Sequence, residues 1–235
     1  MVRLTVVCDD FSGAEQGFRT SYGFALLIEL PDRTLLFDTG TDPGDLLHNL
    51  RAHGADPRQL DAVILSHNHY DHTDGLAGIL DRNPRIPVYV HRDWDRPHSF
   101  KGFTVPEANR VTVDGGRAYP ELASGLYLTS STHSGDYGGI YEHACVITTG
   151  SNDIMITGCC HPGLEVFLDE RAGDLPLTII GGLHGFRFGD RQAGSVGRAL
   201  RQIVCCHCTA NHDLFRAQFG DRCLRVAVGR PLEVG

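Results

Sequence analysis

The stretch Ser-His-Asn-His-Tyr-Asp-His-Thr-Asp-Gly-Leu, residues 66–76, places three imidazoles and a carboxylate within six positions, directly after a short apolar run. In an extended segment His67 and His69 point the same way, so both can bind one metal ion. Asp71 and His72 follow where the chain turns and can face a neighbouring position. Imidazole and carboxylate ligands suit zinc, and also iron or manganese. Four ligand-type residues in this order favour a metal site over a solvated polar loop.

Around this stretch, the hydrophobic pattern predicts strands and helices in loose alternation. Strands are expected at residues 2–7, 24–30, 33–37, 62–65, 87–90, 125–128, 144–149, 153–157, 177–180 and 225–228. Helices are expected at residues 43–53, 73–80 and 191–203, and around Leu214. Residues 92–118 have little periodicity and predict a loop over the site. No linker or repeat is visible, which favours a single domain spanning residues 1–235, with two sheets and covering helices.

Composition limits the partners. The formal net charge is −8 and no run of Lys and Arg is present, which argues against a nucleic-acid partner. No apolar stretch approaches the roughly 18 residues that a membrane helix needs. The first eight residues predict a strand and not a signal peptide. We therefore expect a cytoplasmic protein that acts on a small-molecule substrate.

Eight cysteines are present, and five of them lie beside His161 or His207: Cys159, Cys160, Cys205, Cys206 and Cys208. In a chain of this length without an export signal, such cysteines indicate reduced thiols, with a labile disulfide as the alternative.

The order His67-x-His69-x-Asp71-His72 resembles the signature of the metallo-β-lactamase superfamily. Residues 36–40, Leu-Phe-Asp-Thr-Gly, agree with that superfamily in order and spacing. The resemblance covers nearly the whole chain. It implies an α/β fold, the αββα sandwich, in which two mixed β-sheets are flanked by helices and the metals lie at one edge of the paired sheets. It also implies one or two divalent metal ions, with zinc first and iron or manganese as alternatives.

Five further segments run in sequence: Tyr-Gly-Phe at 22–24, Glu-His-Ala-Cys-Val-Ile at 142–147, Ile-Thr-Gly-Cys-Cys-His-Pro-Gly at 156–163, Gly-Gly-Leu-His at 181–184 and His-Cys-Thr at 207–209. Together they resemble the branch of dihydropterin ribofuranosylaminobenzene-phosphate synthase-like proteins. These segments indicate a branch better than they indicate a substrate.

The resemblance implies six metal ligands in two sets: His67, His69 and His161, then Asp71, His72 and His207. His184 follows a strand and two glycines, and is either a catalytic residue or packs behind the site. Asp38 either orients a ligand imidazole by accepting its other N–H or caps a turn. The histidines at positions 48, 53, 91, 98, 133 and 212 are expected to be ordinary.

One departure concerns the aspartate with which many superfamily members bridge two ions at a late strand end. The corresponding strand here ends in Gly158-Cys159-Cys160, without a carboxylate. Thiolate binds zinc well, so a cysteine could replace the missing ligand. We expect Cys159 or Cys160 to lie within reach of the metal site.

The implied function is metal-dependent hydrolysis or group transfer on a small anionic substrate, through a metal-activated water or a metal-stabilised leaving group. Asp71 would hold the water and pass a proton to the leaving group. One alternative is a dihydropterin-diphosphate transferase, in which pyrophosphate leaves a dihydropterin methyl group. Another is a non-catalytic metal- or redox-sensing protein that uses the cysteine-flanked histidines.

Overall fold

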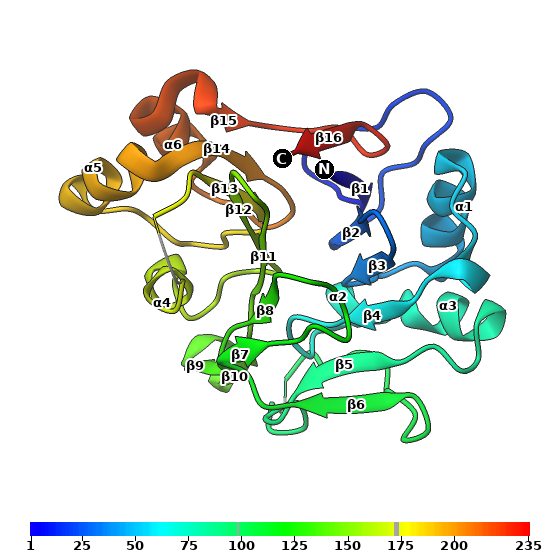
Figure 1. Ribbon diagram of the computed structural model, residues 1–235. Helices are drawn as coiled ribbons and strands as arrows, with labels where there is room; N and C mark the ends of the chain where they lie inside the picture. Colours follow the sequence, from blue (N-terminus) through cyan, green and yellow to red (C-terminus); the bar gives the residue numbers. More distant parts are fainter. Residues whose placement is uncertain (98, 172–173) are drawn as a thin grey trace.

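The computed structural model describes residues 1–97, 99–171 and 174–235. Two seven-stranded sheets pack face to face, and helices cover their outer faces (Figure 1). Both sheets mix parallel and antiparallel strands, so the expected sandwich of two mixed sheets is confirmed.

The first sheet has the order β16-β1-β2-β3-β4-β5-β6, and its strands from β3 to β6 are parallel. Its strands are β1 (Val2–Cys8), β2 (Ala25–Glu29), β3 (Thr34–Phe37), β4 (Ala62–Ile64), β5 (Val88–His91), β6 (Arg110–Val113) and β16 (Pro231–Val234). Its outer face is covered by α1 (Pro43–His53) and α3 (Leu76–Arg82), with the short α2 (Tyr70–Thr73) and η1 (Pro57–Gln59) nearby.

The second sheet has the order β15-β14-β13-β12-β11-β8-β7, and its strands from β12 to β15 are parallel. Its strands are β7 (Arg117–Ala118), β8 (Leu126–Leu128), β11 (Cys145–Thr148), β12 (Asp153–Thr157), β13 (Leu177–Gly181), β14 (Leu200–Cys205) and β15 (Cys223–Leu224). Its helices are α4 (Leu164–Asp169), α5 (Asp190–Ala199) and α6 (His212–Phe219). A separate hairpin, β9 (Thr132–Ser134) and β10 (Ile140–Glu142), encloses η2 (Asp136–Gly138), and η3 (Gly220–Arg222) precedes β15.

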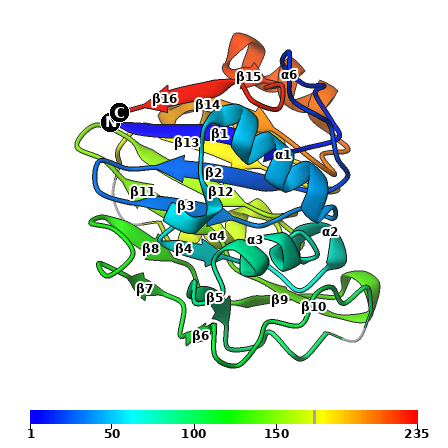
Figure 2. The same ribbon diagram turned by 90° about the vertical axis from the view of Figure 1, so that its right-hand side faces the viewer.

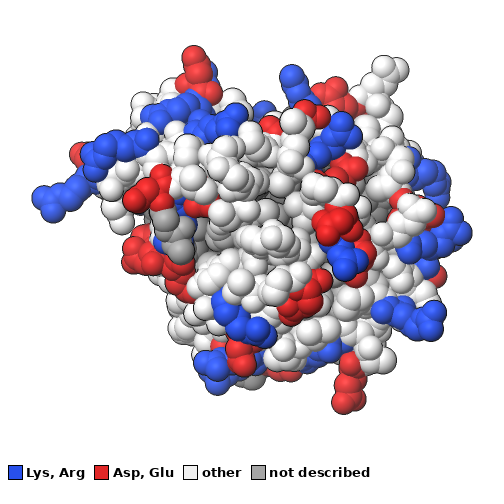
Figure 3. All heavy atoms as spheres, viewed as in Figure 1, with Lys and Arg blue, Asp and Glu red and all other residues white. Residues whose placement is uncertain are grey.

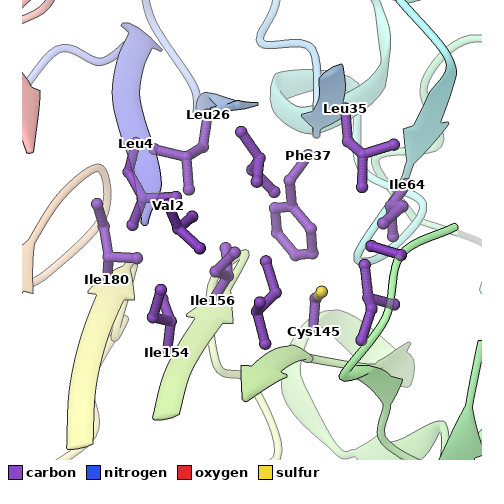
Figure 4. Packing of buried hydrophobic residues seen from close by; sticks show 14 of the residues in the cluster. Val2, Leu4, Leu26, Leu35, Phe37, Ile64, Cys145, Ile154, Ile156 and Ile180 are labelled. Carbon is purple, nitrogen blue, oxygen red and sulfur yellow. The ribbon is translucent and has the colours of Figure 1, made fainter. Parts of the chain in front are cut away.

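The core between the sheets follows from strand alternation. Leu35 and Phe37 point between the sheets while Leu36 points toward α1 and α3, because successive side chains of a strand face opposite sides. Ile154 and Ile156 of β12 face the same core from the other sheet (Figure 4). A sheet that is buried on both faces needs continuous apolar strands, which is what these segments supply.

Three predictions of secondary structure were wrong. The helix expected at 191–203 ends at Ala199, and β14 follows, because its apolar residues are buried between β13 and β15. Residues 92–118 contain β6 and β7. The last strand is β16, which pairs with β1, whereas Val228 makes only an isolated bridge to Ala14.

Basic and acidic side chains are interspersed on the face shown in Figure 3, and neither sign forms a continuous field there. Within the described residues, no helix is both long enough and apolar enough to cross a membrane.

Candidate metal centre

The predicted site residues meet at one edge of the sandwich. β4 leads into the segment that carries His67 and His72, while β12, β13 and β14 lead to His161, His184 and His207. The carboxyl ends of parallel strands meet at the same edge of a sheet, which brings these distant segments together. In Figure 2, α2 lies toward the right-hand edge of the sandwich.

The first set of donors consists of His67, His69 and His161. One ring nitrogen of each lies within 4.8 Å of the others. Among the described residues, the buried Nε2 atoms of His67 and His161 have no hydrogen-bond partner. A buried polar atom without a partner is costly, so these nitrogens fit a metal ion that would engage them. Burial, followed by neighbouring histidines, holds the pKa of His67 well below its usual value, which favours the neutral form that binds metals.

Asp38 orients two of the imidazoles. Its Oδ2 accepts the Nδ1 hydrogen of His72 at 2.7 Å and the Ser66 hydroxyl hydrogen at 2.7 Å. The Ser66 oxygen lies 2.8 Å from Nδ1 of His67, so it can accept the hydrogen on that nitrogen. This network leaves Nε2 of both rings free of hydrogen and aimed into the site. Of the two roles considered for Asp38, the structure supports imidazole orientation.

The second set consists of Asp71, His72 and His207, whose donor atoms also lie within 4.8 Å of one another. Nε2 of His207 lies 3.1 Å from Oδ2 of Asp71, and Nε2 of His72 lies 3.9 Å from the same oxygen. Burial raises the pKa of Asp71, but His72 and His207 outweigh it and hold that pKa well below its usual range.

His207 is held between two carboxylates. Its Nδ1 donates to Asp10 at 2.6 Å, and its backbone N–H donates to Asp9 at 2.6 Å. Burial lowers the pKa of His207, but hydrogen bonds to Asp10 and Asp71 raise it to about 10. The carboxylates of Asp10 and Asp71 on either side of the ring make this a position that favours positive charge, as a metal cation would supply.

The side chains of the two cysteines after β12, Cys159 and Cys160, point to different surroundings. The Sγ atom of Cys159 lies 3.1 Å from Nε2 of His72. Cys160 packs instead in the apolar cluster beneath α4. Of the two cysteines considered, Cys159 is the one within reach of the site.

A buried carboxylate positions the loop that follows β12. Oε1 of Glu142 accepts the backbone N–H groups of Gly158, Cys159 and Cys160 at 3.1, 2.9 and 2.8 Å, and Oε2 accepts that of His161 at 2.8 Å. Glu142 therefore holds the backbone of Cys159 and His161 in place, and with it the points from which their side chains extend toward the site.

We expect Glu142→Gln to lower the free energy of unfolding by about 1–3 kcal/mol, because a buried amide NH₂ would face N–H donors that lose their acceptor. Urea unfolding of the metal-free protein measures this change. Glu165→Gln, at an exposed position, is the matched control. Equal unfolding midpoints for the two variants would contradict the positioning role of Glu142.

A cavity of about 270 Å³ opens over both donor sets. It is lined by Tyr22, His69, Tyr70, Asp71, Phe100, Tyr137, Cys159, His161, His184, His207 and Cys208. Four of these residues are aromatic and none is Lys or Arg. The cavity therefore offers rings for stacking, and its cationic groups are limited to histidines and any bound metal.

Six non-glycine residues of the described chain have left-handed backbone. Four of them line this cavity: Phe100, Tyr137, His184 and Cys208. Of the other two, Cys160 lies between the lining residues Cys159 and His161, and Asp38 is hydrogen-bonded to His72. This conformation costs energy in residues other than glycine and persists where the surroundings hold it. Such strain is concentrated at functional sites, which marks this edge of the sandwich independently of the histidines.

His184 lies in the cavity wall, with its ring centroid 4.9 Å from that of His161. The structure thus places it facing the cavity and not behind the site. The remaining histidines do not belong to the converging groups: His48 and His53 contact a backbone carbonyl and Glu29, His133 packs on Tyr141, His212 contacts Asp213, and His91 is buried beside His143. His98 lies outside the described residues.

Sequence reasoning missed several residues that support the ligands. Asp10 and Asp136 each accept a hydrogen bond from Nδ1 of a predicted ligand, His207 and His161. Glu142 belongs to the segment 142–147, which carries the family resemblance, but the sequence predicted no role for its carboxylate. The one usable signal was the Asp9-Asp10 pair at the end of the first strand, because acidic residues at strand ends often reach a site edge.

The model of the Metallo-beta-lactamase superfamily matches residues 19–193, which is more than half of the chain. The chain therefore belongs to the metallo-beta-lactamase superfamily. A relative from Methanocaldococcus jannaschii, 7,8-dihydropterin-6-methyl-4-(beta-D-ribofuranosyl)-aminobenzene-5'-phosphate synthase, is 24% identical over 280 residues. That match covers 97% of this chain and 95% of the relative.

Solved structures agree on the fold. Tm1679, described as a metal-dependent hydrolase of the beta-lactamase superfamily, superposes with a TM-score of 0.76 at 23% identity, covering 100% of this chain and 99% of that one. Zinc-bound PqqB from Methylobacterium extorquens has a TM-score of 0.61 at 15% identity, with 99% and 100% coverage. At these identities the likeness establishes the fold.

Proposed function

We propose that this protein is a metal-dependent enzyme that catalyses hydrolysis or group transfer on a small substrate with an anionic group. The observation that carries the proposal is the pair of buried, unpartnered Nε2 atoms of His67 and His161, which converge with His69 beneath the cavity. Zinc is the metal we favour, with iron or manganese as alternatives. When bound, the ion supplies Lewis-acid activation of water or of the leaving group.

The chain's own residues would divide the remaining tasks. Asp71 faces the cavity as a carboxylate, and we propose that it accepts a proton from the attacking group and later returns it to the leaving group. His184, on the cavity wall, would donate a hydrogen bond to the anionic group of the substrate. Asp38 and Asp10 would hold His72 and His207 in the orientation that binding requires.

The aromatic wall suits a substrate with a planar part. Tyr22 and Tyr70 stack at 6.2 Å between ring centroids, and Phe100 meets Tyr137 edge to face at 5.2 Å. Because none of the described residues that line the cavity is Lys or Arg, the substrate's negative charge would be neutralised at the metal and at the histidines. The second candidate is a dihydropterin-diphosphate transferase. It is supported by the synthase relative and by the aromatic side chains of the cavity wall, which could stack on a pterin ring.

Product analysis separates these candidates. We expect the metal-loaded protein to convert a generic ester or phosphodiester with water alone if it is a hydrolase. A transferase would instead release pyrophosphate from a dihydropterin diphosphate only when an aromatic amine acceptor is present. Metal binding without turnover in either assay, together with an affinity that changes on thiol oxidation, would favour a sensor and contradict both enzymes.

A further inference from the structure

Two thiols lie together in the wall of the cavity. The Sγ atoms of Cys159 and Cys208 are 3.3 Å apart. The two residues follow different strands, β12 and β14, and neither thiol is bonded in a disulfide. Cys208 has left-handed backbone, so its side chain is directed into the cavity at a conformational cost.

The surroundings of Cys159 link the two donor sets. Its Sγ lies within 4.8 Å of donor nitrogens of His67 and His72, and in a second group within 4.8 Å of His207 and the Cys208 thiol. His67 belongs to the first set and His207 to the second. Cys159 thus has a donor atom close to members of both sets.

We propose that Cys159 and Cys208 are metal ligands, with Cys159 between the two metal positions and Cys208 completing the position of Asp71, His72 and His207. The inference rests on the proposed metal-dependent function and adds sulfur to its ligands. Thiolate is a soft ligand, so the second position would prefer zinc or cadmium to manganese or magnesium. On binding, each thiol gives up its proton to solvent, and no oxidant or reductant is involved.

A second thiol pair supplies the matched control. The Sγ atoms of Cys205 and Cys223 are 3.9 Å apart, within the apolar cluster between the second sheet and its helices. Neither residue belongs to a group of converging metal donors among the described residues. Both cysteine pairs therefore place two thiols close together. Among the described residues, only Cys159 and Cys208 also have imidazole donors within reach.

The test is anaerobic titration of the metal-free protein with cobalt(II) chloride, followed by absorption spectroscopy. Cobalt shows visible d–d bands with any tetrahedral ligand set, and a sulfur-to-cobalt charge-transfer band in the near ultraviolet only when thiolate is bound. We expect both features in the wild type. The charge-transfer band should weaken in Cys159→Ala and in Cys208→Ala and vanish in the double variant, while Cys205→Ala keeps it.

The outcomes separate this inference from the function on which it rests. Visible bands without the charge-transfer band, or a charge-transfer band that survives in the double variant, would overturn the thiolate ligands and leave the histidine site standing. No cobalt bands at all would overturn both proposals.

If the double variant does not fold, alkylation of the wild type decides the question. Cadmium should slow iodoacetamide labelling of Cys208 at least about tenfold, because a metal-bound thiolate is a poor nucleophile. Equal rates with and without cadmium, located by mass spectrometry, would overturn the proposal.

Discussion

The double variant His67→Ala, His69→Ala should lose the ion of the first donor set. Only His161 of that set would remain, with the proposed Cys159 thiolate beside it, and two ligands hold a divalent ion far more weakly than the full set. The loss in affinity should exceed the 10–100-fold that removal of a residue supporting a ligand typically costs. Elemental analysis of protein purified without added zinc, normalised to protein concentration, measures it.

The control for this variant removes two histidines that lie outside the converging groups, in His48→Ala, His133→Ala. Its metal content should equal that of the wild type. A His67→Ala, His69→Ala protein with the full wild-type metal content would refute the assignment of the first set.

Asp71→Asn should reduce turnover by about 10²–10⁴-fold, the usual scale for a lost general acid–base. Asparagine keeps the shape and one oxygen but removes the charge and the proton acceptor. His207, which lies 3.1 Å from the carboxylate, would also lose an anionic partner. Rate and metal content should be measured on the same sample, using a generic phosphodiester or ester.

The metal content tells the two possible roles of Asp71 apart. A proton-transfer role predicts nearly unchanged metal with slow turnover, whereas a role mainly as a ligand predicts loss of the second ion together with activity. Asp81→Asn, at an exposed carboxylate on α3, should match the wild type in both measurements. Full activity in Asp71→Asn would exclude both roles and leave the fold assignment untouched.

The sequence predicted the metal ligands that lie in one contiguous segment of the chain. His67, His69, Asp71 and His72 lie within six positions, so local spacing alone indicated shared metal binding. His161 and His207 required the resemblance to a family, because nothing local states which strand ends meet. The structure then brought all six predicted ligands into two groups.

The supporting residues could not be predicted, because their contacts are distant in sequence. Asp10 reaches His207 across 197 positions, and no local pattern records that pairing. The fold shows the same limit at residues 200–203, where helical spacing favoured a continued helix but burial between β13 and β15 selected a strand. Pairing partners decide such segments more than intrinsic propensity does.

Each of the two donor sets draws its residues from both halves of the chain. The run from His67 to His72 follows a strand of the first sheet, whereas His161 and His207 follow strands of the second. A metal ion shared among them would act as a non-covalent cross-link between the two sheets. By mass action, an ion present at about 1,000 times its dissociation constant stabilises the native state by about 4.1 kcal/mol. Metal supply would then set the thermodynamic stability of the folded protein as well as its activity, since the ion favours the state in which the sheets are packed together.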